Sequence, residues 1–188
     1  MVKLIYGVGF NDGKYPTKFK GEHTKEYRLW RNMLARCYSS SHPTYADCVV
    51  STAFRSYSYF YEWCQSQIGF GQESYHLDKD LLFKGNKLYS ESECLFLPKT
   101  INVLLTNRVN HRGSSPIGVR THANGYQSRL NLFGRHHHLG TFTSREEAFQ
   151  AYKTAKEAHV KHMAELYKAD IDPRAYAALM AYQVEITD

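Results

Sequence analysis

Apolar residues recur at intervals of three and four in two stretches of the first half of the chain. In residues 23–38 the repeat consists of Tyr27, Trp30, Leu34 and Cys37. Thr24 can cap the first turn of this segment. Residues 54–68 repeat the spacing with mostly aromatic side chains, and Gly69 follows them. The pattern predicts two helices, each with one buried stripe.

The pattern changes between residues 74 and 98, where short extended runs replace the helical spacing. These runs predict two strands joined by a turn at Gly85 and Asn86, followed by a helix from about Lys99. We interpret this as a ββα outline. Residues 109–115 contain turn formers without apolar periodicity and predict a linker.

The second half predicts three strands within residues 116–142 and a long helix after Ser144, which can form a capping box with Glu147. A last helix is expected around residues 172–183. The predicted fold class is α+β, with a ββα domain and a three-stranded antiparallel sheet packed on a helix. The expected divisions are a first domain at 1–108, a linker at 109–115, a second domain at 116–168 and a C-terminal helix and tail at 169–188.

Alternation along the three predicted strands separates apolar from polar side chains. One face would carry apolar residues toward the helix, among them Val119, Leu130 and Leu139. The other face would carry Arg120, His122, Gln127, Arg129, Asn131, His136 and His138. Arginine pairs with guanine, and glutamine or asparagine pairs with adenine, so this choice of residues favours reading of a DNA groove over a merely solvated face.

The charge distribution strengthens the expectation of an anionic partner. The net charge is +6 at pH 7 without counting histidine, and no Asp or Glu lies between Glu93 and Glu146. Seven Lys and Arg residues fall in that span. Because an ordinary solvated surface mixes both signs, an acid-free span of this length suggests a surface that faces phosphates. We therefore expect double-stranded DNA as the partner.

Metal sites are the alternative interpretation of the histidines and cysteines. His136, His137 and His138 are consecutive, so on a strand they cannot point to one ion. The four cysteines form no CxxC pair, and buried free thiols are the simpler interpretation. A zinc site made by Cys37, Cys48 and Cys94 is the alternative, but we do not expect a structural zinc ion.

The second half resembles a known family of DNA-binding domains. The sequence GVR, an alternating strand, LGTF and a helix beginning SREEA are similar to the ethylene-response-factor (Apetala-two type) domain. The resemblance implies a three-stranded sheet laid in the major groove. It also implies contact positions at Arg120, His122, Gln127, Arg129, His136 and His138.

The first half resembles phage proteins of the putative HNH endonuclease family. The resemblance is found in the segments WRNMLARCY, YADCVV and YEWC, and in LDKDLL with the following GNKLYSESECLFLPKTIN. The resemblance implies a homing-type endonuclease that hydrolyses DNA phosphodiester bonds with one divalent metal ion. Asp78 and Asn102 fall where its metal ligands lie, so Mg²⁺ or a similar cation is the expected cofactor.

The nuclease interpretation lacks the usual histidine at the position of the general base. Lys79 stands where the family's nucleases carry histidine, and a lysine needs strong desolvation to act as a base at neutral pH. His76 lies two residues before Asp78, shares its face on a strand and can substitute. The competing hypothesis is a catalytically inactive HNH fold that serves as a DNA-binding regulator or host-interaction protein. No apolar run approaches the length of a membrane span, so we expect a protein of the host cytoplasm.

Overall fold

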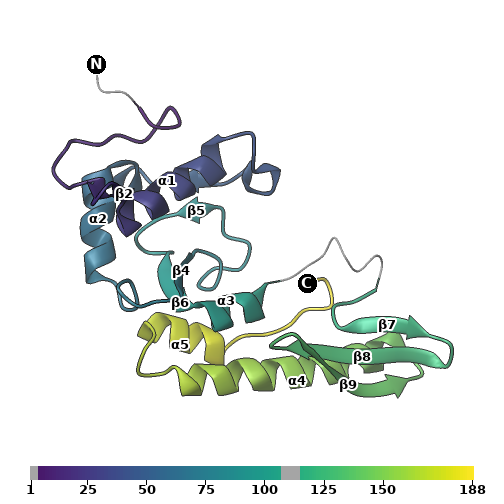
Figure 1. Ribbon diagram of the computed structural model, residues 1–188. Coiled ribbons are helices and arrows are strands. Elements are labelled where there is room, and N and C mark those ends of the chain that lie inside the picture. The colour runs from purple at the N-terminus through teal and green to yellow at the C-terminus, as the bar shows by residue number, and fades with distance from the viewer. Residues whose placement is uncertain (1–3, 107–114) are drawn as a thin grey trace. The chain divides into compact units, whose positions relative to one another are not determined.

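The computed structural model describes residues 4–106 and 115–188, and the fold is mixed α+β (Figure 1). The described chain forms two compact units. The first contains the residues up to Pro98 together with Asp170–Ala175, and the second contains Lys99–Ala169 and Tyr176–Asp188. The expected boundary at residues 108 and 109 and most of the expected linker lie outside the described residues, so the domain limits stay a prediction.

The first unit is built around the two amphipathic helices that the spacing predicts. They are α1 (Lys25–Tyr38), capped by Thr24, and α2 (Tyr57–Ser66), capped by Ser56. The strands of this unit are β1 (Lys18–Phe19), β2 (Glu22–His23), β3 (Val49–Val50), β4 (Tyr75–Asp78), β5 (Leu88–Tyr89) and β6 (Leu95–Pro98). The second helix is shorter than the predicted residues 54–68 because a separate 3-10 turn, Ala53–Arg55, precedes it.

Aromatic side chains fill the core between α1 and α2. Trp30 is fully buried, and its indole Nε1 donates a hydrogen bond of 2.8 Å to the carbonyl of Phe54. The Phe54 ring meets Phe60 and Trp63 edge-on, with ring centroids 5.1 and 4.8 Å apart. Edge-to-face contacts of this kind stabilise beyond the burial of apolar area. The core is therefore a set of interlocked rings in which the indole donor of Trp30 is satisfied.

The strands expected between residues 74 and 98 pair in a different order from the simple hairpin of the sequence interpretation. β4 pairs antiparallel with β6, while β5, which lies between them in sequence, pairs parallel with β3. The Gly85 turn is present with φ of +75°, but it leads into β5 instead of joining the two paired strands. The helix α3 (Lys99–Leu105) begins where the sequence predicts it. The finer HNH-type ββα assignment stays a proposal.

The second unit contains the three-stranded antiparallel sheet. Its strands are β7 (Val119–His122), β8 (Gly125–Leu132) and β9 (Arg135–Phe142), in the order β7-β8-β9. Phe133 and Gly134 join the last two strands with φ of +51° and +80°, which is a two-residue type I′ turn. This hairpin brings the histidines of β9 beside β8.

The helix α4 (Arg145–Leu166) covers one side of this sheet (Figure 1). The predicted capping box is present: Ser144 accepts a hydrogen bond from the Glu147 backbone, and the Glu147 side chain accepts one from the Ser144 backbone. Gly118 has φ of +76°, and a Cβ there would lie 2.0 Å from the Tyr152 ring. Only glycine therefore lets the start of the sheet approach the helix this closely.

The end of the chain forms α5 (Pro173–Met180) and a tail. The helix is shorter than the predicted residues 172–183. Beyond it, the backbone N–H of Val184 donates to Glu157, and Lys153 donates to the carbonyl of Val184, so α4 anchors the tail. Among the described residues, no helix is long and apolar enough to cross a membrane.

A buried lysine of α4 makes the stability of the second unit depend on pH. Lys156 is 6% exposed, and its ammonium donates to the carbonyl of Leu104 at the end of α3. Burial lowers the pKa of Lys156 to about 8 from its usual 10.5. Between these values the unfolded chain binds more protons than the folded one, so this residue makes stability rise as pH rises from about 8 to 10.5.

We expect Lys156→Met to remove this pH-dependent contribution. Urea unfolding at pH 7.5 and 9.5 measures the free energy of unfolding. Between these two pH values it should rise by about 2 kcal/mol more in the wild type than in the variant. Lys161→Met, which changes an exposed lysine of the same helix, serves as the control and should follow the wild type. Equal gains in wild type and Lys156→Met would contradict the assignment.

Candidate nucleic-acid interface

The register of the three-stranded sheet decides which side chains share a face. Arg120 pairs with Gln127, and Gln127 pairs with Thr141 on the other side. Arg129 pairs with His138 in the same way. Directly paired residues of antiparallel strands lie on one face. The face turned away from α4, called the outer face below, carries Arg120, His122, Gln127, Arg129, Asn131, His136, His138 and Thr141.

The opposite face of the sheet forms the apolar core with α4. Val119 and Leu130 are buried there against Ala148, Phe149 and Tyr152. His137 is paired with Leu130 and therefore points to this side, although it is exposed near the strand end. The three consecutive histidines are thus divided between two faces, as expected for neighbours on a strand.

A bulge in β9 changes the alternation in a way that the sequence did not reveal. The register shifts between Ser128 and Arg129, and Leu139 is the additional residue opposite them. As a result Phe142 packs into the core with Leu139, and Thr141 belongs to the outer face. Strict alternation places Thr141 on the wrong face. The sequence signal of the bulge is a glycine inside the strand, Gly140, whose φ in the structure is +148°.

Several outer-face side chains are already oriented by contacts within the sheet. The guanidinium Nη2 of Arg129 donates a hydrogen bond of 2.6 Å to Oε1 of Gln127. Asn131 Oδ1 accepts 3.0 Å from the backbone N–H of Gly134 in the turn. His122 Nδ1 accepts 3.3 Å from the backbone N–H of Asn124. These contacts leave donor groups of Arg129 and Asn131 for a ligand.

The negative charges nearest in sequence lie at the start of α4. They are Glu146 and Glu147, and both are exposed. Glu147 is held by the Thr143 hydroxyl at 2.9 Å, and this hydrogen bond, followed by the Ser144 backbone, lowers the pKa of its carboxyl group. The outer face itself contains arginine, histidine and amide side chains and no carboxylate. Its charge suits an anionic ligand.

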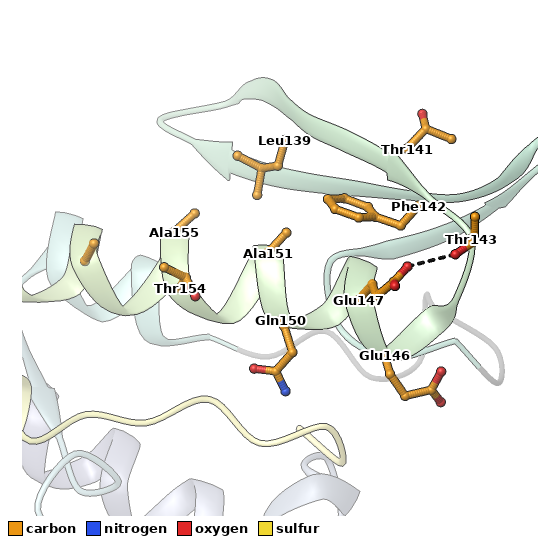
Figure 2. A pocket seen from close by; sticks show the side chains of 11 residues that line it. Leu139, Thr141, Phe142, Thr143, Glu146, Glu147, Gln150, Ala151, Thr154 and Ala155 are labelled. Carbon is orange, nitrogen blue, oxygen red and sulfur yellow. Dashed lines mark hydrogen bonds between the residues drawn. The ribbon is translucent and has the colours of Figure 1, made fainter.

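An open groove of about 1020 Å³ lies between β9 and α4, on the helix side of the sheet (Figure 2). Figure 2 shows Leu139 and Phe142 on this side, with Ala151 and Ala155 on the helix opposite them and Thr141 pointing away. The lining residues also include the two carboxylates at the start of α4. This groove is apolar and acidic, and so does not suit a phosphate backbone.

In the first unit, the candidate residues His76 and Asp78 lie on β4, and Lys79 follows directly after it. Tyr75 and Leu77 pack toward the core, so His76 and Asp78 share the opposite face. His76 is exposed, whereas Asp78 is half-buried. Asp78 Oδ1 accepts hydrogen bonds from the backbone N–H groups of Asp80 at 3.0 Å and Leu81 at 2.8 Å. Burial nevertheless raises the pKa of the Asp78 carboxyl group.

Lys79 is placed differently from the other candidate base. It is buried, and its Nζ donates 2.5 Å to Asp80 Oδ1 and also donates to the carbonyl of Asn86. Asn86 in turn donates 2.7 Å to the carbonyl of Lys79, which closes the loop after β4. An ammonium group used as a donor in this way stabilises the loop and has no lone pair to accept a proton. Of the two candidates, the geometry favours His76.

The proposed metal ligands come from different units. Asp78 ends β4 in the first unit, and Asn102 lies half-buried in α3 of the second, so their pairing stays a prediction. A carboxylate and an amide oxygen are donors that suit Mg²⁺, which keeps several waters and needs few protein ligands. In the two described ranges, no group of three or more His, Cys, Asp and Glu side chains is arranged to hold a metal ion.

The four cysteines are all buried and free. Burial raises the pKa of Cys37 to about 12, with Cys48 nearby adding to the effect. Burial likewise raises the pKa of Cys94 to about 12. Protonated thiols of this kind pack as small apolar side chains, which is the simpler of the two sequence interpretations.

Comparison with protein-family models, with curated proteins and with solved structures finds no match for this chain. The resemblances to the ethylene-response-factor domain and to phage HNH proteins therefore remain hypotheses, which rest on the residues quoted for them.

Proposed function

We propose that the chain is a phage-type DNA-binding protein that holds duplex DNA on the outer face of its three-stranded sheet. The observation that carries this proposal is the register, which gathers Arg120, Arg129 and the paired histidines of β9 on one carboxylate-free face. An antiparallel sheet packed on a helix uses one face for its core and leaves the other for a ligand. A two- or three-stranded ribbon has dimensions suited to the major groove.

The side chains of the outer face match the donors and acceptors of base edges. Arg120 and Arg129 can each donate two hydrogen bonds to guanine, and Gln127 can contact adenine. The hydrogen bond between Arg129 and Gln127 holds the guanidinium before DNA arrives, so less side-chain freedom is lost on binding. His136 and His138 share this face and would contact phosphates or bases.

Binding to duplex DNA is expected to depend strongly on salt. Each phosphate that the protein neutralises contributes about −0.9 to the slope of log K against log salt concentration. With at least two phosphates neutralised, the slope should be about −2 or steeper. Fluorescence anisotropy with a labelled duplex at several salt concentrations measures it. A slope near zero would contradict phosphate contact.

Hydrolysis of DNA by the first unit is the second candidate function, and one observation favours it. His76 and Asp78 project from the same face of β4, beside their buried strand partners Leu97 and Leu95. In the proposed HNH-type site, Asp78 and Asn102 would hold Mg²⁺, which would supply polarisation of the scissile phosphate. His76 would take a proton from the attacking water. Lys79 would keep the loop after β4 in place.

The alternative to hydrolysis is an inactive HNH-like unit that assists DNA binding or contacts a host protein. In that case Asp78 has only the role seen in its hydrogen bonds, which is to fix the backbone of Asp80 and Leu81. A nicking assay with variants of His76 and Asp78 separates the two functions, because the inactive protein would bind DNA without cutting it.

A further inference from the structure

A small hairpin of the first unit projects an aromatic ring that takes no part in the core. β1 and β2 pair antiparallel, with Phe19 opposite Glu22. The Phe19 side chain is 69% exposed. Lys20 and Gly21 form a two-residue turn with φ of +49° and +86°, which is a type I′ geometry. Below the strands, the backbone N–H of Thr24 donates 3.1 Å to the carbonyl of Thr17 and closes the hairpin.

Lysines flank this ring on both sides in sequence. Lys18 and Lys20 are both exposed, and the Lys20 ammonium lies 5.5 Å from the centre of the Phe19 ring. An exposed phenylalanine gains nothing from the hydrophobic effect in the free protein. A ring with cations beside it is, however, the combination that binds an unpaired nucleobase by stacking and its phosphates by charge.

The turn itself uses a residue that its backbone conformation disfavours. Type I′ turns prefer asparagine or glycine where Lys20 stands, because other side chains tolerate positive φ poorly. A non-glycine residue held there costs on the order of 1 kcal/mol. The chain thus places a positive charge next to Phe19 at some expense of local stability, which is typical of residues kept for binding.

We infer that the β1–β2 hairpin is a second nucleic-acid site, for single-stranded or locally unpaired DNA. Phe19 stacks on one unpaired base, while Lys20 contacts the phosphate beside it. Lys18 pairs with His23 and so lies on the opposite face of the hairpin. Glu22 lies on the same face as Phe19 and repels phosphate, so the backbone of the nucleic-acid strand passes on the Lys20 side of the ring. A base-paired duplex keeps its bases stacked inside and offers Phe19 no such partner. This site is separate from the outer face of the sheet.

The test measures how the full chain binds a fluorescein-labelled thymidine 15-mer and a duplex of the same length. Phe19→Leu keeps an apolar side chain but cannot stack, and it should weaken binding to the single strand by about 5- to 150-fold. Phe19→Tyr keeps the ring and should restore most of the affinity. Affinity for the duplex should stay at the wild-type value in both variants.

Lys20→Asn supplies a variant whose effect cannot come from unfolding. Asparagine suits the type I′ turn, so the thermal stability should be equal to that of the wild type or higher, while binding to the single strand weakens. The salt slope for the single strand should become shallower by about 0.7.

Two results would overturn the inference: equal affinity of wild type and Phe19→Leu for the single strand, or equal losses for single strand and duplex. When Phe19→Leu is added to the Arg120→Ala/Arg129→Ala variant, affinity for the single strand should fall by the same factor as when it is added to the wild type. That outcome distinguishes this site from the sheet.

Discussion

Replacing Arg120 and Arg129 together by alanine is expected to lower affinity for a selected duplex by a factor on the order of 10² to 10⁴, because each bidentate contact with guanine contributes about 1–3 kcal/mol. Both side chains lie on the outer face and neither belongs to the core beneath the sheet. The fold should therefore survive, as circular dichroism and the unfolding midpoint can show. The duplex is obtained by selection from a random pool with the wild-type protein, and binding is followed by gel shift.

The chain offers a matched control with the same change in net charge. Arg135 pairs with Leu132 and Arg145 lies 5.5 Å from the centre of the Tyr126 ring, so both belong to the helix side of the sheet. Arg135→Ala/Arg145→Ala should weaken binding only slightly and without loss of sequence preference. Equal losses in the two double variants would show that general charge dominates. Unchanged affinity of Arg120→Ala/Arg129→Ala would reject the outer face as the binding surface.

If the first unit is a nuclease, His76→Ala should lower the rate of Mg²⁺-dependent nicking of supercoiled DNA by about 10²- to 10⁴-fold, the usual contribution of a general base. His76 is exposed, so its removal should leave the fold intact. Asp78→Asn should abolish nicking while keeping structure, because an asparagine Oδ1 can still accept hydrogen bonds from Asp80 and Leu81. Gel electrophoresis of nicked and closed circles measures both effects.

His42→Ala is the control for this experiment, since His42 is another exposed histidine of the same unit. It should nick at the wild-type rate. A wild type that binds duplex DNA but stays inert with Mg²⁺ and Mn²⁺ would reject hydrolysis and favour the inactive HNH-like protein. Nicking that persists in Asp78→Asn would show that the assignment of the carboxylate is wrong.

Much of the local structure follows from short-range patterns in the chain. The 3–4 spacing with Thr24 at its start places α1, and the capping box of Ser144 and Glu147 places the start of α4. Alternation separates the outer face from the core in β7 and β8. These features depend on residues a few positions apart, so side-chain spacing and capping chemistry suffice to predict them.

Pairing between distant segments was less predictable. The insertion of β5 beside β3 depends on a contact between residues about forty positions apart, which no local pattern encodes. The role of Lys79 is of the same kind. In the sequence it occupies the place of a catalytic base, but its partners Asp80 and Asn86 become visible only when the loop folds back.

By itself, the sequence determined that this is a basic chain of mixed α+β elements, with an acid-free span and alternating strands that present arginine, glutamine and histidine together. Tertiary structure decided which residues share a face where alternation fails. The bulge at Leu139 turns Phe142 into the core and Thr141 outward, because one additional residue in a strand inverts every side chain beyond it. Tertiary structure also decided that Phe19 stays exposed, since burial depends on what the rest of the fold brings beside a residue and not on its type.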